Sequence, residues 1–102
     1  ICYLESDGHD TVLRRRDGAG ICCKAGILQM EQELADESGT FFKPHRSYLV
    51  NLEYVERIGK KDVQMADGTP IPIARGKWED LNRAYMKYYR RQCAEAVRET
   101  EP

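Results

Sequence analysis

Short runs of alternating apolar and polar residues, separated by glycine turns, make up the first quarter of the chain. Residues 1–6 alternate and predict a strand, and residues 10–16 predict a second one. The dipeptides Asp7-Gly8 and Asp17-Gly18 are typical of tight turns between antiparallel strands. Residues 21–23 predict a short third strand, so this part of the chain is expected to form a small antiparallel sheet.

The period of the apolar residues changes after this sheet. Apolar residues at positions 27, 28, 30 and 34 have acidic residues between them, and this spacing predicts a short amphipathic helix over residues 27–37. Gly39 is expected to end the helix, because glycine readily adopts the left-handed conformation that follows many helix C-termini.

Strand patterns return in the middle of the chain. Residues 41–42 open a strand that Pro44 is expected to interrupt, because proline has no backbone N–H to donate. Residues 47–50 form an apolar run typical of a buried strand, and Asn51 is expected to mark its end as a turn residue whose side chain bonds local backbone.

Two further turns follow. Residues 55–58 and 63–65 predict strands on either side of the turn at residues 59–62. Asp67-Gly68 predicts a second turn, and residues 71–73 predict the returning strand. Because two prolines lie in or beside this last strand, it is expected at a sheet edge or at a bulge.

The remaining chain is predicted to be helical from residue 77 to near its end. An aromatic and apolar stripe is expected to pack on the core, and the other face is basic. The stripe consists of Trp78, Leu81, Tyr85 and Tyr88 or Tyr89, and the basic face carries Lys87, Arg90 and Arg91.

Length and composition indicate one mostly β domain. The chain has 102 residues, of which 41% are hydrophobic and 32% charged, which is ordinary for a soluble domain. No apolar run is long enough to span a membrane, and we expect no secretory signal. Because the chain starts at Ile1 inside a strand-like segment, we expect it to be a piece of a longer protein.

The formal net charge of −1 argues weakly against nucleic-acid binding, but the charges are unevenly distributed. Residues 29–38 are acidic, whereas residues 39–61 and 75–91 are predominantly basic. Such a pattern is compatible with one basic face on a nearly neutral protein, as well as with charges scattered over a solvated surface.

The four cysteines do not predict a disulfide framework or a metal site. Cys22 and Cys23 are adjacent, and the chain has no paired CxxC motif. We expect free thiols in a reducing cytoplasm, with no metal and no cofactor. Buried, unreactive thiols are the default expectation, and a redox role for Cys22-Cys23 or Cys93 stays open as an alternative.

One segment carries a specific resemblance. Residues 41–51 read FFKPHRSYLVN, and after a hairpin residues 71–75 read IPIAR. These motifs resemble the LytTR DNA-binding domain, the effector module of many bacterial response regulators. The opening ICYLE of residues 1–5 and the ILQMEQEL of residues 27–34 resemble the first strand and the helix of that family.

The resemblance covers residues 1–90, and residues 91–102 are expected to form a charged helical extension. It implies an elongated stack of small antiparallel sheets with one short and one longer C-terminal helix. It also implies a cytoplasmic, non-enzymatic domain that reads the major groove through loops. The family usually has an N-terminal receiver or sensor domain, so we expect dimerisation through such a domain and binding to repeated half-sites, without membrane contact by this domain.

Residue by residue, the resemblance divides the candidate site into three roles. Base contacts are expected from Arg75, which can bond guanine through two parallel hydrogen bonds, and from His9 and Arg46. Phosphate contacts are expected from Ser47, Lys43, Lys60, Lys61 and Lys77. Structural roles in shaping loops are expected for His45 and Asn51.

Two alternatives from other classes remain beside DNA binding. A protein–protein interaction module would use the acidic helix over residues 27–37 or the basic helix over residues 77–91, and would show no salt-sensitive DNA affinity. An enzyme could be imagined from His9, His45 and Ser47, but the chain contains no nucleophile elbow, P-loop or metal-binding motif.

Overall fold

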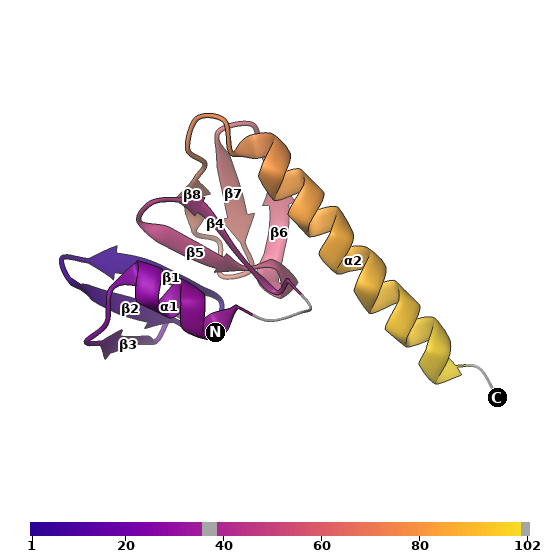
Figure 1. The fold of residues 1–102 in the computed structure, drawn as a ribbon, viewed down its shortest axis with the longest axis horizontal. Helices are drawn as coiled ribbons and strands as arrows, with labels where there is room; N and C mark the ends of the chain where they lie inside the picture. The colour runs from indigo at the N-terminus through magenta and orange to yellow at the C-terminus, as the bar shows by residue number, and fades with distance from the viewer. Residues whose placement is uncertain (36–38, 101–102) are drawn as a thin grey trace.

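The computed structural model describes residues 1–35 and 39–100, with side chains as far as residue 93. Its larger sheet has five antiparallel strands in the order β3-β2-β1-β5-β4 (Figure 1). These strands are β1 (Tyr3–Asp7), β2 (Asp10–Arg14), β3 (Gly20–Cys23), β4 (Phe41–His45) and β5 (Tyr48–Asn51).

A second antiparallel sheet has three strands in the order β6-β7-β8, and a 3-10 turn over Leu52–Tyr54 leads into it. Its strands are β6 (Val55–Ile58), β7 (Asp62–Met65) and β8 (Pro70–Pro72). Two helices complete the fold, α1 (Ile27–Leu34) and α2 (Trp78–Thr100). The predicted fold class, mostly β with one short and one longer helix, is confirmed.

The two central strands β1 and β5 of the five-stranded sheet are buried on both faces. Neighbouring residues on a strand point to opposite faces, so the paired residues Tyr3 and Val50 face one way and the paired Leu4 and Leu49 the other. Leu4 and Leu49 pack with Ile27 and Met30 of α1. Tyr3 and Val50 belong to the core shared with the three-stranded sheet and α2.

That shared core places α2 against the sheets through few residues. Leu81 is fully buried and Tyr88 nearly so, together with Val63, Met65 and Ile71 of the smaller sheet. The far end of the helix extends past both sheets (Figure 1), and the molecule has extents of 50 × 27 × 25 Å.

Several predicted element ends were wrong by a few residues. The first strand runs over Tyr3–Asp7 instead of 1–6, and the second stops at Arg14 instead of 16. The second strand stops early because the backbone N–H of Arg15 bonds the carbonyl of Ala19 and closes a turn. Asp62 belongs to β7 instead of to the predicted turn at residues 59–62. The last strand is Pro70–Pro72 instead of 71–73.

The short helix ends earlier than predicted. It stops at Leu34 because Ala35 has extended backbone angles of φ −62° and ψ 127°. Gly39 therefore does not cap it, and the remaining predicted helical residues, 36 and 37, lie outside the described residues.

The pairing of β4 is irregular around Pro44, as predicted, but the strand does not end there. The strand continues to His45, and the register shifts between Phe42 and His45, where the missing N–H of Pro44 would otherwise break the pairing. β4 is an edge strand, which is where sheets tolerate proline. The predicted edge position of the proline-containing strand β8 is confirmed.

The predicted core stripe on the last helix was partly wrong. Leu81 and Tyr88 are buried, and Tyr85 is partly buried against the same core. Trp78 is 42% exposed and Tyr89 is 55% exposed, so Tyr88 takes the core position and Trp78 lies at the surface. Tyr89 instead stacks on Tyr85, with 6.3 Å between ring centroids.

Candidate nucleic-acid interface

The turn between β1 and β2 consists of Gly8 and His9. The flanking residues Asp7 and Asp10 are the last pair of the hairpin register. Gly8 has φ +62°, a conformation that side chains rarely adopt, and this makes the two-residue turn feasible at that position. The tight turn leaves the imidazole of His9 exposed at the tip of the hairpin.

The turn between β4 and β5 consists of Arg46 and Ser47, with Arg46 exposed. Nδ1 of His45 accepts a hydrogen bond from the backbone N–H of Ser47, with an N···N distance of 3.1 Å. The His45 ring also packs edge-on against Tyr48, with 5.8 Å between centroids. His45 thus uses its side chain within the turn, while Arg46 extends from it.

The segment over residues 73–77 connects β8 to α2 and carries Arg75. The backbone N–H of Ala74 donates to the carbonyl of Pro44 (2.7 Å), and the N–H of Lys77 donates to the carbonyl of Ala74 (3.0 Å). Gly76 has φ +83°, which turns the chain into the helix. Arg75 lies exposed between these two anchored points.

The turn between β6 and β7 covers residues 59–61 and exposes Lys60 and Lys61. The N–H of Gly59 donates to the carbonyl of Asp62 (2.8 Å) and closes the turn. The indole Nε1 of Trp78 donates to the carbonyl of Gly59 (3.0 Å), so the start of α2 is attached to this turn.

Backbone hydrogen bonds link these four segments, directly or through the residues next to them, and we call the four together the loop edge: residues 8–9, 46–47, 59–61 and 73–77. The N–H of Ser6, beside the first turn, donates to the carbonyl of Ser47 (2.8 Å). The 73–77 segment is bonded to Pro44, as described above, and the N–H of Ile73 donates to the carbonyl of Lys61 (2.9 Å). The loop edge therefore draws on both sheets and on the start of α2.

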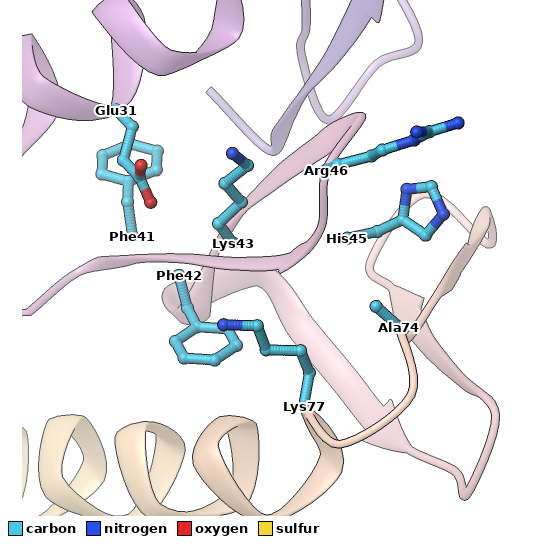
Figure 2. A pocket seen from close by; sticks show the side chains of 8 residues that line it. All are labelled: Glu31, Phe41, Phe42, Lys43, His45, Arg46, Ala74 and Lys77. Atoms are coloured by element: carbon cyan, nitrogen blue, oxygen red, sulfur yellow. The ribbon is translucent and has the colours of Figure 1, made fainter.

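A depression of about 460 Å³ lies beside the loop edge, between α1, β4 and the start of α2. Figure 2 shows Lys43 with Phe41 and Glu31 on one side of β4, and Lys77 beside Phe42 on the other. Arg46 and His45 extend from the far end of β4, next to Ala74 (Figure 2).

The loop edge and the depression are rich in cations that lack carboxylate partners. None of Arg46, Arg75, Lys60 and Lys61 forms an ion pair with another described residue. The described ion pairs lie elsewhere, between Arg14 and Glu5 (2.8 Å) and near the start of α2 at Arg83. Exposed cations without partners are free to meet an anionic ligand.

A comparison with protein-family models identifies the family of this chain. The model of the LytTr DNA-binding domain matches residues 1–86. The chain belongs to the LytTR DNA-binding domain family.

A solved structure supports the same fold. It is a LytTr DNA-binding domain from Bacillus cereus, described as part of a methyl-accepting/DNA response regulator. It is 21% identical, superposes with a TM-score of 0.67, and the match covers 84% of this chain and 80% of that one. No curated protein sequence matches the chain.

The structure brings most predicted site residues of this LytTR domain together. His9, Arg46, Ser47, Arg75, Lys77, Lys60 and Lys61 lie on the loop edge, and Lys43 and His45 line the adjoining depression. Asn51 lies apart from them at the end of β5 and is only 6% exposed. Its Oδ1 accepts from the N–H of Glu53 (2.9 Å) and its Nδ2 donates to the carbonyl of Ile1 (2.8 Å).

Sequence reasoning missed the contribution of Trp78 to the loop edge of this LytTR domain. Helical spacing predicts a core position for Trp78, whereas its indole bonds the lysine-bearing β6–β7 turn. The sequence signal for this role is the place of the tryptophan at the first residue of the helix.

The thiols also differ from expectation. Cys22 and Cys93 are exposed, so the expectation of buried thiols was wrong for them, while Cys2 is buried. Burial, together with the nearby Asp67, raises the pKa of the Cys2 thiol above its ordinary value. Among the residues that the structure describes, no group of His, Cys, Asp and Glu could hold a metal ion, and no helix is apolar enough to span a membrane.

Proposed function

We propose that this LytTR domain binds double-stranded DNA in a sequence-specific manner through the loop edge, as the effector domain of a bacterial transcription regulator. The observation that supports the proposal is the continuity of the loop edge, whose exposed arginines and lysines have no carboxylate partners among the described residues. A DNA partner in turn implies a cytoplasmic location.

Arg75, Arg46 and His9 are the proposed base contacts. All three are exposed at tight turns, so each can extend beyond the backbone toward a groove. A guanidinium can donate two parallel hydrogen bonds to O6 and N7 of guanine, a pattern specific to the major groove. His9, with its smaller ring on a two-residue turn, suits a contact to a single base edge.

Lys60, Lys61, Lys77, Lys43 and Ser47 are the proposed phosphate contacts. Lys60 and Lys61 share a turn of the second sheet, so they would contact the DNA phosphate backbone at a different point from the Arg46–Ser47 turn. Lysine neutralises phosphate as a point charge and carries no base information. These residues are therefore expected to set affinity and its dependence on salt.

We further propose that binding occurs at repeated half-sites. One domain offers one loop edge, so two domains brought together through an N-terminal receiver or sensor domain would occupy two half-sites. This arrangement would couple the input signal to DNA affinity through dimerisation.

The test is selection of a binding sequence from a randomised duplex pool, followed by affinity measurements with Arg75→Ala at two salt concentrations. We expect an enriched motif, and a loss of about 1–3 kcal/mol for Arg75→Ala with relaxed preference at one guanine. Lys61→Ala should weaken binding to all sequences alike and reduce the salt slope by about one.

Arg16→Ala is the matched control. Arg16 is also exposed but follows β2 at the end of the sheet away from His9. It should leave the selected affinity unchanged. If Arg75→Ala and Arg16→Ala behave alike, or if no motif enriches and binding does not depend on salt, the proposal fails and the protein-interaction alternative takes its place.

A further inference from the structure

Three of the four edge strands in the two sheets carry features that discourage pairing with another chain. β4 carries Lys43 and Pro44 and a register shift. β8 begins and ends with proline. β6 exposes Glu56 and Arg57 and also has a register shift. Charges, prolines and bulges are the usual means by which proteins protect sheet edges.

β3 has none of these features. Its sequence is Gly-Ile-Cys-Cys, without charge or proline, and it pairs with β2 in unbroken register over all four residues. No other strand of the described chain pairs with its outer side. Ile21, in the middle of β3, is 52% exposed. An open, regular and uncharged edge with an exposed apolar residue is a template for strand addition.

We propose that β3 pairs in antiparallel fashion with β3 of a second copy of this chain. The axis of such a pair is perpendicular to the sheet, so residues directly opposite each other point to the same face. Ile21 can therefore lie directly opposite Ile21 of the second copy. Both side chains then point to the face that α1 covers, because Ile21 is paired with Leu13, which packs on that face. Gly20 then lies opposite Cys22 of the other copy.

Charge at the ends of β3 favours this antiparallel arrangement over a parallel one. Asp17 precedes the strand and Lys24 follows it, and both are exposed. Antiparallel pairing about Ile21 brings Asp17 of one copy within one residue of Lys24 of the other. Parallel pairing would instead place the two aspartates together and the two lysines together, which is unfavourable.

This dimer would orient the two loop edges in opposite directions. The β1–β2 and β4–β5 turns lie at the same end of the sheet, because Asp7 pairs with Asp10 and Glu5 with Tyr48. The perpendicular axis reverses that end in the second copy. The β3 dimer would therefore hold two separate duplexes, in contrast to neighbouring half-sites on one duplex, and its formation does not depend on the proposed DNA contacts.

The first test is sedimentation velocity of the 102-residue chain over a wide concentration range, compared with Ile21→Lys. We expect a concentration-dependent dimer, weakened about tenfold or more by Ile21→Lys, because like charges would face each other across the pair. Leu28→Lys is the matched control, since Leu28 is 61% exposed and lies on α1 instead of on β3, and should leave the dimer intact. A wild-type chain that stays monomeric at millimolar concentration, or equal weakening by both variants, overturns the proposal.

The second test measures the register directly. In a background with Cys22, Cys23 and Cys93 changed to serine, Ile21→Cys should form an intermolecular disulfide under mild oxidation. Directly opposite residues in antiparallel strands have Cα atoms about 4.5–5.5 Å apart, within the range that a disulfide spans. Leu28→Cys in the same background should form it much more slowly. Equal rates for the two variants would contradict the pairing.

Discussion

The position of Arg75 is set by backbone hydrogen bonds of the neighbouring residues. Ala74 is bonded to Pro44 of β4, and Lys77 is bonded to Ala74, so the arginine extends from a short anchored turn. His45 does the same for Arg46 by accepting the N–H of Ser47. Exposed side chains on anchored turns lose less entropy on binding than side chains on mobile loops.

Burial of two ionisable side chains leads to a prediction on pH. Burial raises the pKa of Cys2 from its ordinary value of 9.0 and that of Tyr3 from 10.0. In the unfolded chain these groups ionise at those ordinary values, while the folded chain keeps them protonated to higher pH. The free energy of unfolding should therefore be undiminished below pH 9 and fall as pH rises above it, by at most about 1.4 kcal/mol per pH unit and group.

Urea unfolding at neutral pH and at pH values above 9 measures this effect. Cys2→Ala should lower stability at all pH values, because Cys2 is completely buried, but should show a smaller decline on the alkaline side. An equal alkaline decline in the wild type and in Cys2→Ala would rule out the thiol as its source.

At the residue scale, the sequence predicted which residues gather at the site but not every contact between them. His45, Arg46, Ser47 and Arg75 were predicted from the motif in residues 41–51 and from the arginine in residues 71–75. In the structure they lie at or beside the loop edge. The hydrogen bond from Trp78 to Gly59 could not be predicted. Helical periodicity indicates which face of a helix is buried, but not which turn of another element lies beside the helix.

At the scale of elements, the strands were predicted well in number and order, and their ends less well. Turns such as Asp7-Gly8 have strong local signals, whereas strand ends depend on pairing partners far along the chain. Pro44 illustrates the difference, since an edge position and a register shift allow β4 to continue through it. The early end of α1 rests on the backbone of Ala35, which has no sequence signal.

The attachment of α2 to the sheets depends on Leu81 and Tyr88. Leu81→Ala would leave a cavity in the shared core and should lower the free energy of unfolding by about 2–5 kcal/mol. Met86→Ala, at a residue 50% exposed on the same helix, should change it by about 0.5 kcal/mol or less. Thermal or urea unfolding of the two variants provides the measurement, and a larger effect at Met86 would contradict the assigned core.

At the scale of the whole molecule, a net charge of −1 conceals the distribution that matters. The cations of the loop edge come from three separate segments, residues 46–47, 59–61 and 73–77, and only folding brings these segments together. Composition alone therefore argues against nucleic-acid binding, whereas the folded arrangement supports it. The opposite end of the five-stranded sheet also exposes arginines, Arg15 and Arg16, and thus offers an internal comparison.

The most direct measurement is an NMR titration of the chain with a selected duplex, following the backbone amides. The account predicts that shift changes concentrate at residues 8–9, 46–47, 59–61 and 75–77, and that the amides of Arg15, Arg16 and Gly18 stay unchanged. Shift changes centred on residues 15–18, with the loop edge unaffected, would contradict the assignment of the loop edge as the DNA-binding surface.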